Sequence, residues 1–343
     1  MQNPNQPSRR MFLQSAAAAG ATPDVTQRNT QHVEPPVSQM GKRPLGKTGL
    51  EVSILGLGGF HLGATKDQEE ATRIVHGALD AGINFFDSAW EYQDGESEAR
   101  LGRALEGRRK EALLMTKVCT HGRKKRVAMQ MLEESLGRLK TDHLDVWQIH
   151  EVVYENDPEM IFGPDGAAEA LLQAKKEGKV RFVGFTGHKD PSFHLKVLSL
   201  GFPFDTVQLP LNPFDATFRS FESQVLPELR RQGIAALGMK SLGGSGEMVK
   251  SGAVTVEEAL RYSMSLPVAC TISGIDSLEV LEQNLKIALN FKPMSEAERQ
   301  ALATRCTEYA ADGRLELFKT TTQYDGKVGR EQHGYPAAEK LPA

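Results

Sequence analysis

The chain has 343 residues, of which 40% are hydrophobic, and this is enough to bury the core of one large α/β domain or two modest ones. Its 41 Lys and Arg residues nearly balance 44 Asp and Glu residues, so the formal charge of −3 creates no basic field that would attract nucleic acid or anionic lipid. The three cysteines, Cys119, Cys270 and Cys306, are scattered and lack the spacing of a metal knuckle or redox pair, which argues against a disulfide scaffold.

The first 39 residues differ in composition from the rest of the chain. Arg9 and Arg10 precede a short apolar stretch that ends in Ala-Gly-Ala, the small-x-small form of a signal cleavage site. This segment is similar to a twin-arginine export signal, which implies the twin-arginine translocase as a partner and a periplasmic location. The alternative is a disordered basic N-terminus on a cytoplasmic protein, with Met40 as an internal start. Nowhere do about 18 apolar residues run together, so we expect no membrane span.

From residue 43 onward, short apolar runs alternate with segments of helical periodicity. A hairpin-like stretch over 43–55 leads into the first run. The apolar runs are 52–58, 83–89, 112–118, 144–150, 180–187, 206–212, 234–240 and 269–275. The helical segments are 67–80, 97–106, 125–139, 166–177, 191–199, 217–232, 255–265 and 278–289.

Eight strand-then-helix units in about 250 residues match a single (β/α)8 TIM barrel with an N-terminal β-hairpin. Strands of such a barrel are buried on both faces, which is why they read as continuous apolar runs. An open, doubly wound sheet is the rival architecture. The run LGLGG at 55–59 does not favour this rival, because it lacks a clean G-x-G-x-x-G pattern. We therefore assign 1–39 to signal and linker, 40–317 to the barrel and 318–343 to a C-terminal tail.

The ends of the predicted strands have an unusual set of polar residues. In a barrel of this type, the loops after the strands build the active site. The second strand ends in Asp87 with Tyr92 in the following loop, the third ends in Lys117 and the fourth in His150. Alone, each residue has an ordinary explanation as a helix cap, a solvated charge or a core histidine. Four ionisable types at consecutive strand ends predict one shared catalytic site.

Several segments, found in order along the chain, resemble the aldo-keto reductase superfamily. They are GKTGLEVSILGLGG, GINFFDSAWEY followed by GESEARLGRAL, LLMTKV, DHLDVWQIH, GKVRFVGFTG, DTVQLPLNPFD and ISGIDSLEVLEQNL, and they span residues 43–290. The resemblance implies an NAD(P)-dependent oxidoreductase that interconverts a carbonyl, in an aldehyde, ketone or sugar, and an alcohol. It assigns the catalytic tetrad to Asp87, Tyr92, Lys117 and His150.

These four residue types fit hydride transfer coupled to proton transfer. As hydride reaches the carbonyl carbon, the oxygen gains negative charge and needs a proton, which Tyr92 can deliver. A free phenol has a pKa of about 10, and an adjacent ammonium on Lys117 is expected to lower that pKa. Asp87 then keeps Lys117 charged and in place. His150 orients the carbonyl by a hydrogen bond to the same oxygen.

The resemblance also implies a nicotinamide dinucleotide site along the strand ends. Gln208 is expected to hold the nicotinamide amide, and because TGH replaces the Ser-Asn pair of the family, either Thr186 and His188 substitute for that pair or the contact is rearranged. Met239 stands where an aromatic ring often stacks, and the loop SLGGSG lets backbone amides approach the pyrophosphate. The full set of predicted cofactor contacts is Gly59, Phe60, Asp87, Thr186, Gly187, Gln208, Met239, Ser241, Gly243, Gly274, Asp276 and Asn284.

Asp276, in the loop SGIDS, bears on the choice of nucleotide. Many members of the family have a Lys or Arg here that grips the 2′-phosphate of NADP. A carboxylate repels that phosphate but accepts a hydrogen bond from a free ribose hydroxyl. The sequence therefore favours NAD over NADP.

Specificity residues are harder to place. Trp90 and His150 are expected to line the substrate pocket, and loop packing is the alternative for Trp90. The tail from 318 lacks helical or strand periodicity. Either Phe318 or Tyr324 shapes the pocket, or the tail is exposed to solvent.

No metal site and no nucleic-acid site is predicted. The histidines outside the tetrad lack the i,i+4 spacing of metal ligands, and the basic run at 122–126 is too short for nucleic-acid binding. Two other function classes stay open. One is a nicotinamide-binding redox sensor with little catalytic activity, which the complete tetrad argues against. The other is an unrelated barrel enzyme, such as an aldolase that forms a Schiff base on Lys117.

Overall fold

The computed structural model describes residues 39–326 together with Pro336 and Lys340. The arginine pair and the linker lie outside the described residues, as does most of the tail after residue 326. The predicted export signal and the boundaries of the predicted segments therefore stay predictions.

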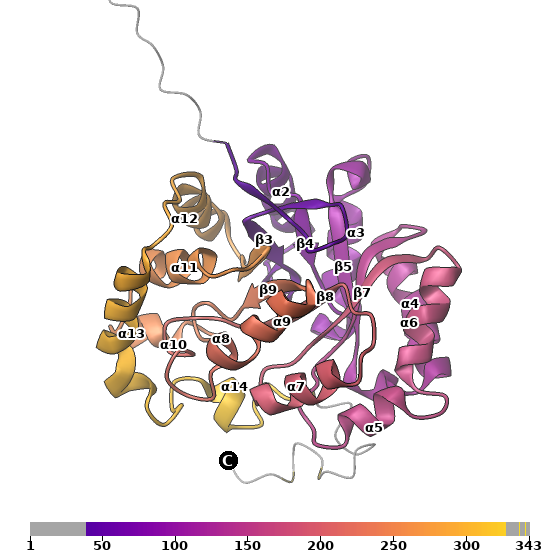
Figure 1. The fold of residues 1–343 in the computed structure, drawn as a ribbon. Helices are drawn as coiled ribbons and strands as arrows, with labels where there is room; N and C mark the ends of the chain where they lie inside the picture. The colour runs from indigo at the N-terminus through magenta and orange to yellow at the C-terminus, as the bar shows by residue number, and fades with distance from the viewer. Residues whose placement is uncertain (1–38, 327–335, 337–339, 341–343) are drawn as a thin grey trace, which may run out of the picture. The chain divides into compact units, whose positions relative to one another are not determined.

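Eight parallel strands close into a barrel in the order β10-β3-β4-β5-β6-β7-β8-β9 (Figure 1). The strands are β3 (Leu55–Gly58), β4 (Phe85–Asp87), β5 (Leu113–Val118), β6 (Leu144–Ile149), β7 (Val180–Thr186), β8 (Thr206–Pro210), β9 (Ala235–Met239) and β10 (Cys270–Gly274). Each falls within one of the eight predicted apolar runs. The preceding hairpin pairs β1 (Lys42–Pro44) with β2 (Glu51–Ser53) antiparallel. The predicted (β/α)8 barrel with an N-terminal hairpin is confirmed.

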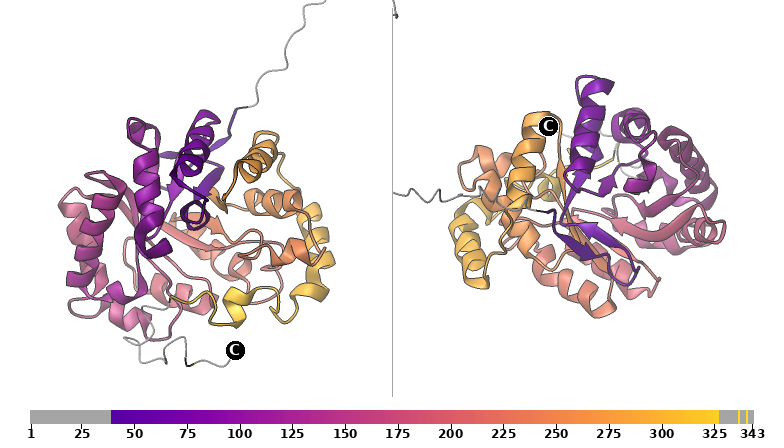
Figure 2. Two further views of the ribbon diagram at one scale, coloured as in Figure 1. Left: turned by 180° about the vertical axis from the view of Figure 1, so that it is seen from behind. Right: turned by 90° about the horizontal axis from the view of Figure 1, so that it is seen from above.

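Helices surround the barrel and connect its strands (Figures 1 and 2). The helices are α1 (Gly59–Gly63), α2 (Gln68–Asp80), α3 (Glu96–Ala104), α4 (Lys125–Leu139), α5 (Asp157–Phe162), α6 (Ala167–Lys176), α7 (Pro191–Ser199), α8 (Phe221–Gln224), α9 (Leu226–Gln232), α10 (Glu247–Lys250), α11 (Val256–Ser265), α12 (Leu278–Leu289), α13 (Glu296–Ala310) and α14 (Leu317–Thr320). Three short 3₁₀ helices are η1 (Tyr92–Gly95), η2 (Arg109–Glu111) and η3 (Thr120–Arg123).

Two helical regions differ from the prediction. The segment predicted as one helix over 217–232 divides into α8 and α9, because Pro227 in the first turn of α9 has no N–H with which to continue a helix from α8. Helix α13 was not predicted. It buries only a narrow stripe of Leu302, Cys306 and Ala310, although the capping box of Ser295 and Glu298 marks its start.

The barrel strands separate two apolar layers. The larger core lies between the strands and the outer helices and includes Phe86 and Trp147. The smaller core fills the barrel interior with Phe85, Met115 and Val146, and Leu45 of the hairpin region packs into it. Successive strand residues face opposite sides, which is why neighbours such as Phe85 and Phe86 belong to different cores. Both faces of each strand are therefore buried.

The two ends of the barrel differ in what lies over them. The β1–β2 hairpin lies at one end, and α14 lies at the opposite end (Figures 1 and 2). Backbone and side-chain hydrogen bonds attach the segment around α14 to the loops that follow β7 and β8; for example, the His188 ring contacts the Phe318 carbonyl oxygen at 2.9 Å. Within the described residues, no helix has the length and apolar character needed to cross a membrane.

Candidate active site

A buried ion pair lies where β4 and β5 end. Asp87 is the last residue of β4, and Lys117 precedes the last residue of the neighbouring strand β5. The Lys117 ammonium donates to Asp87 Oδ1 at 2.5 Å and to the Ser88 carbonyl oxygen at 2.6 Å. The Lys117 side chain is only 1% exposed and the Asp87 side chain only 5%. Burial raises the pKa of the Asp87 carboxyl, and the adjacent ammonium of Lys117 opposes this rise.

Tyr92 lies over this ion pair. The Lys117 nitrogen is 3.5 Å from the Tyr92 hydroxyl oxygen and 4.9 Å from the centre of the ring. The imidazole of His150, which directly follows β6, meets the Tyr92 ring edge-on with 5.6 Å between ring centres. The Phe60 ring also meets the phenol ring edge-on, with 5.3 Å between ring centres. The structure thus brings together all four residues predicted as a tetrad.

The pKa of Tyr92 differs in direction from the expectation. Burial raises it well above the ordinary value, and the carboxylates of Asp87, Glu91 and Glu151 act in the same direction. The expected lowering by Lys117 does not prevail, because the ammonium is already bonded to Asp87 and stands 3.5 Å from the phenol. In the free protein the phenol keeps its proton, which suits a proton donor.

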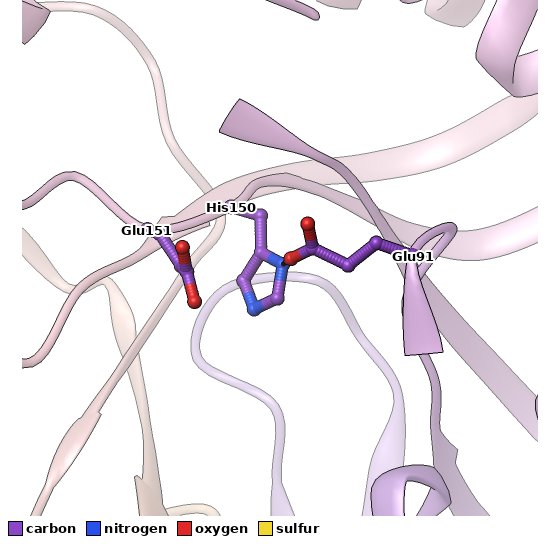
Figure 3. A group of neighbouring side chains, drawn as sticks. All are labelled: Glu91, His150 and Glu151. Atoms are coloured by element: carbon purple, nitrogen blue, oxygen red, sulfur yellow. Dashed lines mark ion pairs between the residues drawn. The ribbon is translucent and has the colours of Figure 1, made fainter. Parts of the chain in front are cut away.

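Two carboxylates flank His150 on opposite sides of its ring (Figure 3). Glu91 Oε1 lies 2.8 Å from His150 Nδ1, and potential ligand atoms of Glu91, His150 and Glu151 all lie within 4.8 Å of one another. Burial lowers the pKa of His150 well below its ordinary value, although Glu151 acts to raise it. Histidine and carboxylates are ligand types that metals use, yet no spacing in the sequence indicated this group. The prediction of no metal site stays a prediction.

The predicted nicotinamide contacts lie beside the ion pair. Gln208, on β8, places its Nε2 3.4 Å from Asp87 Oδ2. Thr186, at the end of β7, places its hydroxyl 4.0 Å from the sulfur of Met239, the last residue of β9. Gly187 follows Thr186 and packs against the backbone of Val152. The Nδ1 of His188 contacts the Phe318 carbonyl oxygen at 2.9 Å, while its buried Nε2 has no hydrogen-bond partner within the described residues, so the predicted assistance by His188 stays a prediction.

The other predicted cofactor residues lie around the same end of the barrel. Gly59 and Phe60 begin α1 directly after β3, and a side chain at Gly59 would meet the backbone of Asp87. Gly274 ends β10 and packs against the ring of His61, and exposed Asp276 follows in the next loop. The buried Asn284 of α12 donates to the Ser273 hydroxyl at 3.0 Å, which ties α12 to β10.

The loop after β9 contains Ser241 and Gly243, and its predicted contact with the pyrophosphate stays a prediction. Ser241 is buried, and the Gly243 amide already donates to the Lys240 carbonyl at 2.9 Å. The Ser245 amide donates to Glu247 at 2.9 Å. These two amides are therefore committed within the loop rather than free for a pyrophosphate.

Comparison with known proteins agrees with this geometry. A model of the Aldo/keto reductase family matches residues 54–253, more than half of the chain. The chain belongs to the aldo/keto reductase family.

Individual members of the aldo/keto reductase family are similar to this chain. Aldo-keto reductase YhdN of Bacillus subtilis is 30% identical over 210 residues, 57% of this chain and 60% of YhdN, so the match spans three fifths of that relative. The 6-dehydroglucose reductase of Novosphingobium aromaticivorans is 30% identical over 217 residues, 59% of this chain and 69% of that relative. The holo form of aldo-keto reductase AKR11C1 from Bacillus halodurans has a TM-score of 0.67 at 25% identity and covers 78% of this chain and 96% of that one.

Membership in the aldo/keto reductase family makes this protein an NAD(P)H-dependent oxidoreductase that acts on small carbonyl compounds or alcohols. The residues near the ion pair fit a nicotinamide. The buried Oε1 of Gln208 has no hydrogen-bond partner within the described part of the chain. Because a buried acceptor without a donor is costly, an amide N–H of the nicotinamide is the kind of group that it lacks.

Trp90 contacts the outer helix α4. Its indole N–H donates to Glu134 of α4 at 2.7 Å, and the Arg138 guanidinium stacks 5.1 Å from the ring centre. These contacts with an outer helix favour the loop-packing alternative.

Sequence reasoning missed three charged residues of this aldo/keto reductase site. Glu91 and Glu151 are the neighbours of tetrad residues in the chain, a proximity that could have drawn attention to them. Lys240 directly follows β9, and no role was predicted for it. Its position beside the aromatic rings of Phe318 and Tyr324 depends on the fold of the tail.

Proposed function

We propose that this enzyme reduces the carbonyl group of an aldehyde, ketone or sugar with NAD(P)H, and that Tyr92 donates the proton. The observation behind this proposal is the contact between the Tyr92 hydroxyl and the buried Lys117–Asp87 ion pair, at 3.5 Å from the ammonium. A protonated phenol beside a fixed positive charge can lose its proton to a reacting oxygen, because the charge stabilises the phenolate that remains. The name of one relative, 6-dehydroglucose reductase, supports a sugar among the candidate substrates.

Each tetrad residue then has a separate task. A nicotinamide, when bound, would supply hydride to the carbonyl carbon. Tyr92 transfers its proton to the carbonyl oxygen, and Lys117 stabilises the resulting phenolate. Asp87 holds the ammonium in place through the 2.5 Å contact. His150, neutral because burial lowers its pKa, has one N–H with which to orient the carbonyl oxygen.

The residues that would hold the nicotinamide are Gln208, Thr186 and Met239. Gln208 offers its free Oε1 to the amide N–H, while Thr186 and Met239 form the adjacent wall. Gln208 itself lies beside the ion pair, because its Nε2 is 3.4 Å from Asp87 Oδ2.

Steady-state reduction of an aldehyde panel with NADPH and NADH tests the proposal. Tyr92→Phe should lower kcat about 10²- to 10⁴-fold, since the phenol proton is lost, while the nucleotide Kd measured by protein fluorescence stays unchanged. The matched control is Tyr262→Phe, which removes a buried phenol that bonds Glu222 away from the tetrad. Undiminished kcat in Tyr92→Phe would overturn the assignment of Tyr92 as proton donor.

We also propose that NADH is preferred to NADPH. Asp276 is exposed in the loop after β10, where its carboxylate would repel a 2′-phosphate. Asp276→Arg should shift the ratio of the two Kd values toward NADPH by about tenfold. Glu279→Arg, an exposed charge reversal on the first turn of α12, is the control. Tighter binding of NADPH by the unaltered protein would contradict this preference.

A further inference from the structure

Three lysines in or beside the barrel mouth differ in how their charges are balanced. Lys117 bonds Asp87 at 2.5 Å, and the fully buried Lys319 bonds Asp215 at 2.6 Å and Glu316 at 3.0 Å. Lys240 has no carboxylate within 4 Å of its ammonium among the residues that the structure describes. Two of the three charges are neutralised by direct contact, and the third is not.

Aromatic rings of the tail hold the Lys240 ammonium instead. It lies 5.5 Å from the centre of the Phe318 ring and 4.9 Å from that of Tyr324. Such cation–π contacts balance a charge only in part. Burial lowers the pKa of Lys240 to about 8, and the positive charge of Lys117 lowers it further. The carboxylates of Glu151, Glu247 and Asp325 raise this pKa but do not offset the effect of burial. The environment thus leaves this ammonium short of counter-charge.

The backbone holds Lys240 in an unfavourable conformation. Its φ of 53° lies in the left-handed region, where a residue with a side chain costs about 1–2 kcal/mol more than in the right-handed region. The Lys240 carbonyl oxygen accepts hydrogen bonds from the Asn212 side-chain amide at 3.3 Å and from the Gly243 backbone amide at 2.9 Å. These two bonds hold the Lys240 backbone in place. Strained residues held by their surroundings are concentrated at functional sites.

Two backbone amides of the loop after β9 are already used within the loop. The Gly243 and Ser245 amides donate within the loop, and Tyr324 covers Gly244, where an added side chain would meet the Tyr324 hydroxyl. The Tyr324 hydroxyl also lies 2.9 Å from the Ser245 hydroxyl. The Lys240 ammonium is a charged group at the start of this loop that suits a negatively charged ligand group.

We propose that Lys240 is an anion-binding residue of the active-site mouth, which contacts a phosphate or carboxylate group of the bound ligand. This inference rests on the proposed function, because it places the ligand in the same mouth. The anion belongs either to the phosphates of the nicotinamide cofactor or to a carboxylate on the carbonyl substrate. The aromatic faces of Phe318 and Tyr324 hold the ammonium in the free protein, and the ligand then supplies the full negative charge that they lack.

Full-length Lys240→Met and Lys240→Arg variants distinguish these sources. Kd values for NADPH and NADH are measured by fluorescence, and kcat/KM is compared for 4-carboxybenzaldehyde and benzaldehyde, which differ by one carboxylate. The control is Lys189→Met, since Lys189 bonds Asp325 of the tail at 2.7 Å and tests whether a loosened tail alone changes binding.

A cofactor anion predicts that Lys240→Met raises both Kd values about tenfold or more, with the aldehyde preference unchanged. A substrate anion predicts unchanged Kd values and a loss of about tenfold in the preference for the carboxylated aldehyde. In either case Lys240→Arg should retain most of the effect of the lysine, and Lys189→Met should show neither change.

If Lys240→Met changes neither quantity, or if Lys189→Met matches it, the inference is wrong and the ammonium only supports the tail. If the unaltered protein binds no nucleotide and reduces no aldehyde, the proposed function fails and the inference with it. Fold integrity of each variant is checked by its unfolding curve, and Lys240→Arg provides a second test should the Met variant be unstable.

Discussion

Two layers of the same barrel interior have opposite chemistry. Phe85 and Met115 belong to the apolar layer near the hairpin end. Two residues further along the same strands, on the same face, stand Asp87 and Lys117. The apolar layer is the rigid base on which the ion pair is built, and the ion pair has to be held against a large desolvation cost. On each of these two strands, one inward-facing residue therefore contributes to stability and the next inward-facing residue contributes to the chemistry.

The largest effect is expected from breaking the polar layer. Lys117→Met should lower kcat on the order of 1,000-fold, because the phenolate loses its stabilising charge. It should also lower the free energy of unfolding by about 3–5 kcal/mol, because Asp87 remains buried without its counter-charge. Urea titration and steady-state kinetics measure the two effects.

The matched control for this change is Lys175→Met. Lys175 pairs with Asp205 at 2.9 Å on a partly exposed surface, and losing that pair should cost less than about 1 kcal/mol with no change in kcat. Near-normal turnover in Lys117→Met would show that the ion pair is structural only.

A change in the apolar layer should separate stability from chemistry. Phe85→Ala should reduce the free energy of unfolding by about 3–5 kcal/mol, because a cavity replaces a fully buried ring. The kcat of the folded fraction should stay within about twofold, since the tetrad lies one inward position away. Leu172→Ala, at a side chain that is 50% exposed, should be nearly neutral. A large fall in kcat of folded Phe85→Ala would mean that the two layers are coupled.

A smaller effect should come from a histidine outside the barrel interior. His194 of α7 is fully buried between Phe185 and Phe221, and burial lowers its pKa to about 3. The unfolded chain binds a proton near pH 6.5 while the folded protein does not, so the stabilisation is present above pH 6.5 and lost as pH falls below it. Unfolding at pH 5 should require about 2 kcal/mol less than at pH 8 from this group alone.

Replacing the titrating ring tests this contribution. His194→Phe keeps an aromatic ring in the same apolar site and should remove the difference between pH 8 and pH 5, as measured by chemical denaturation. His143→Gln, at a half-exposed ring, should leave it unchanged. An unaltered pH difference in His194→Phe would assign the acid sensitivity to other groups.

The sequence determined the barrel and the four residues that meet at its mouth. Strands buried on both faces must be apolar throughout, so β3–β10 were visible as runs, and β-then-α alternation fixed their parallel order. Because parallel strands end on one side, residues as distant as Asp87 and His150 were placed together by position alone. Helix α13 was not predicted, because its buried stripe is too narrow to produce a helical period of apolar residues in the sequence.

Tertiary structure decided the charges around those four residues. Whether Lys240 finds a partner, whether Trp90 faces α4 or the mouth, and which carboxylates flank His150 depend on contacts between loops far apart in the chain. Local periodicity contains no information on such contacts, since loops follow no repeating pattern. Even the direction of the Tyr92 pKa depended on burial by the whole barrel, which outweighed the neighbouring ammonium that the sequence had indicated.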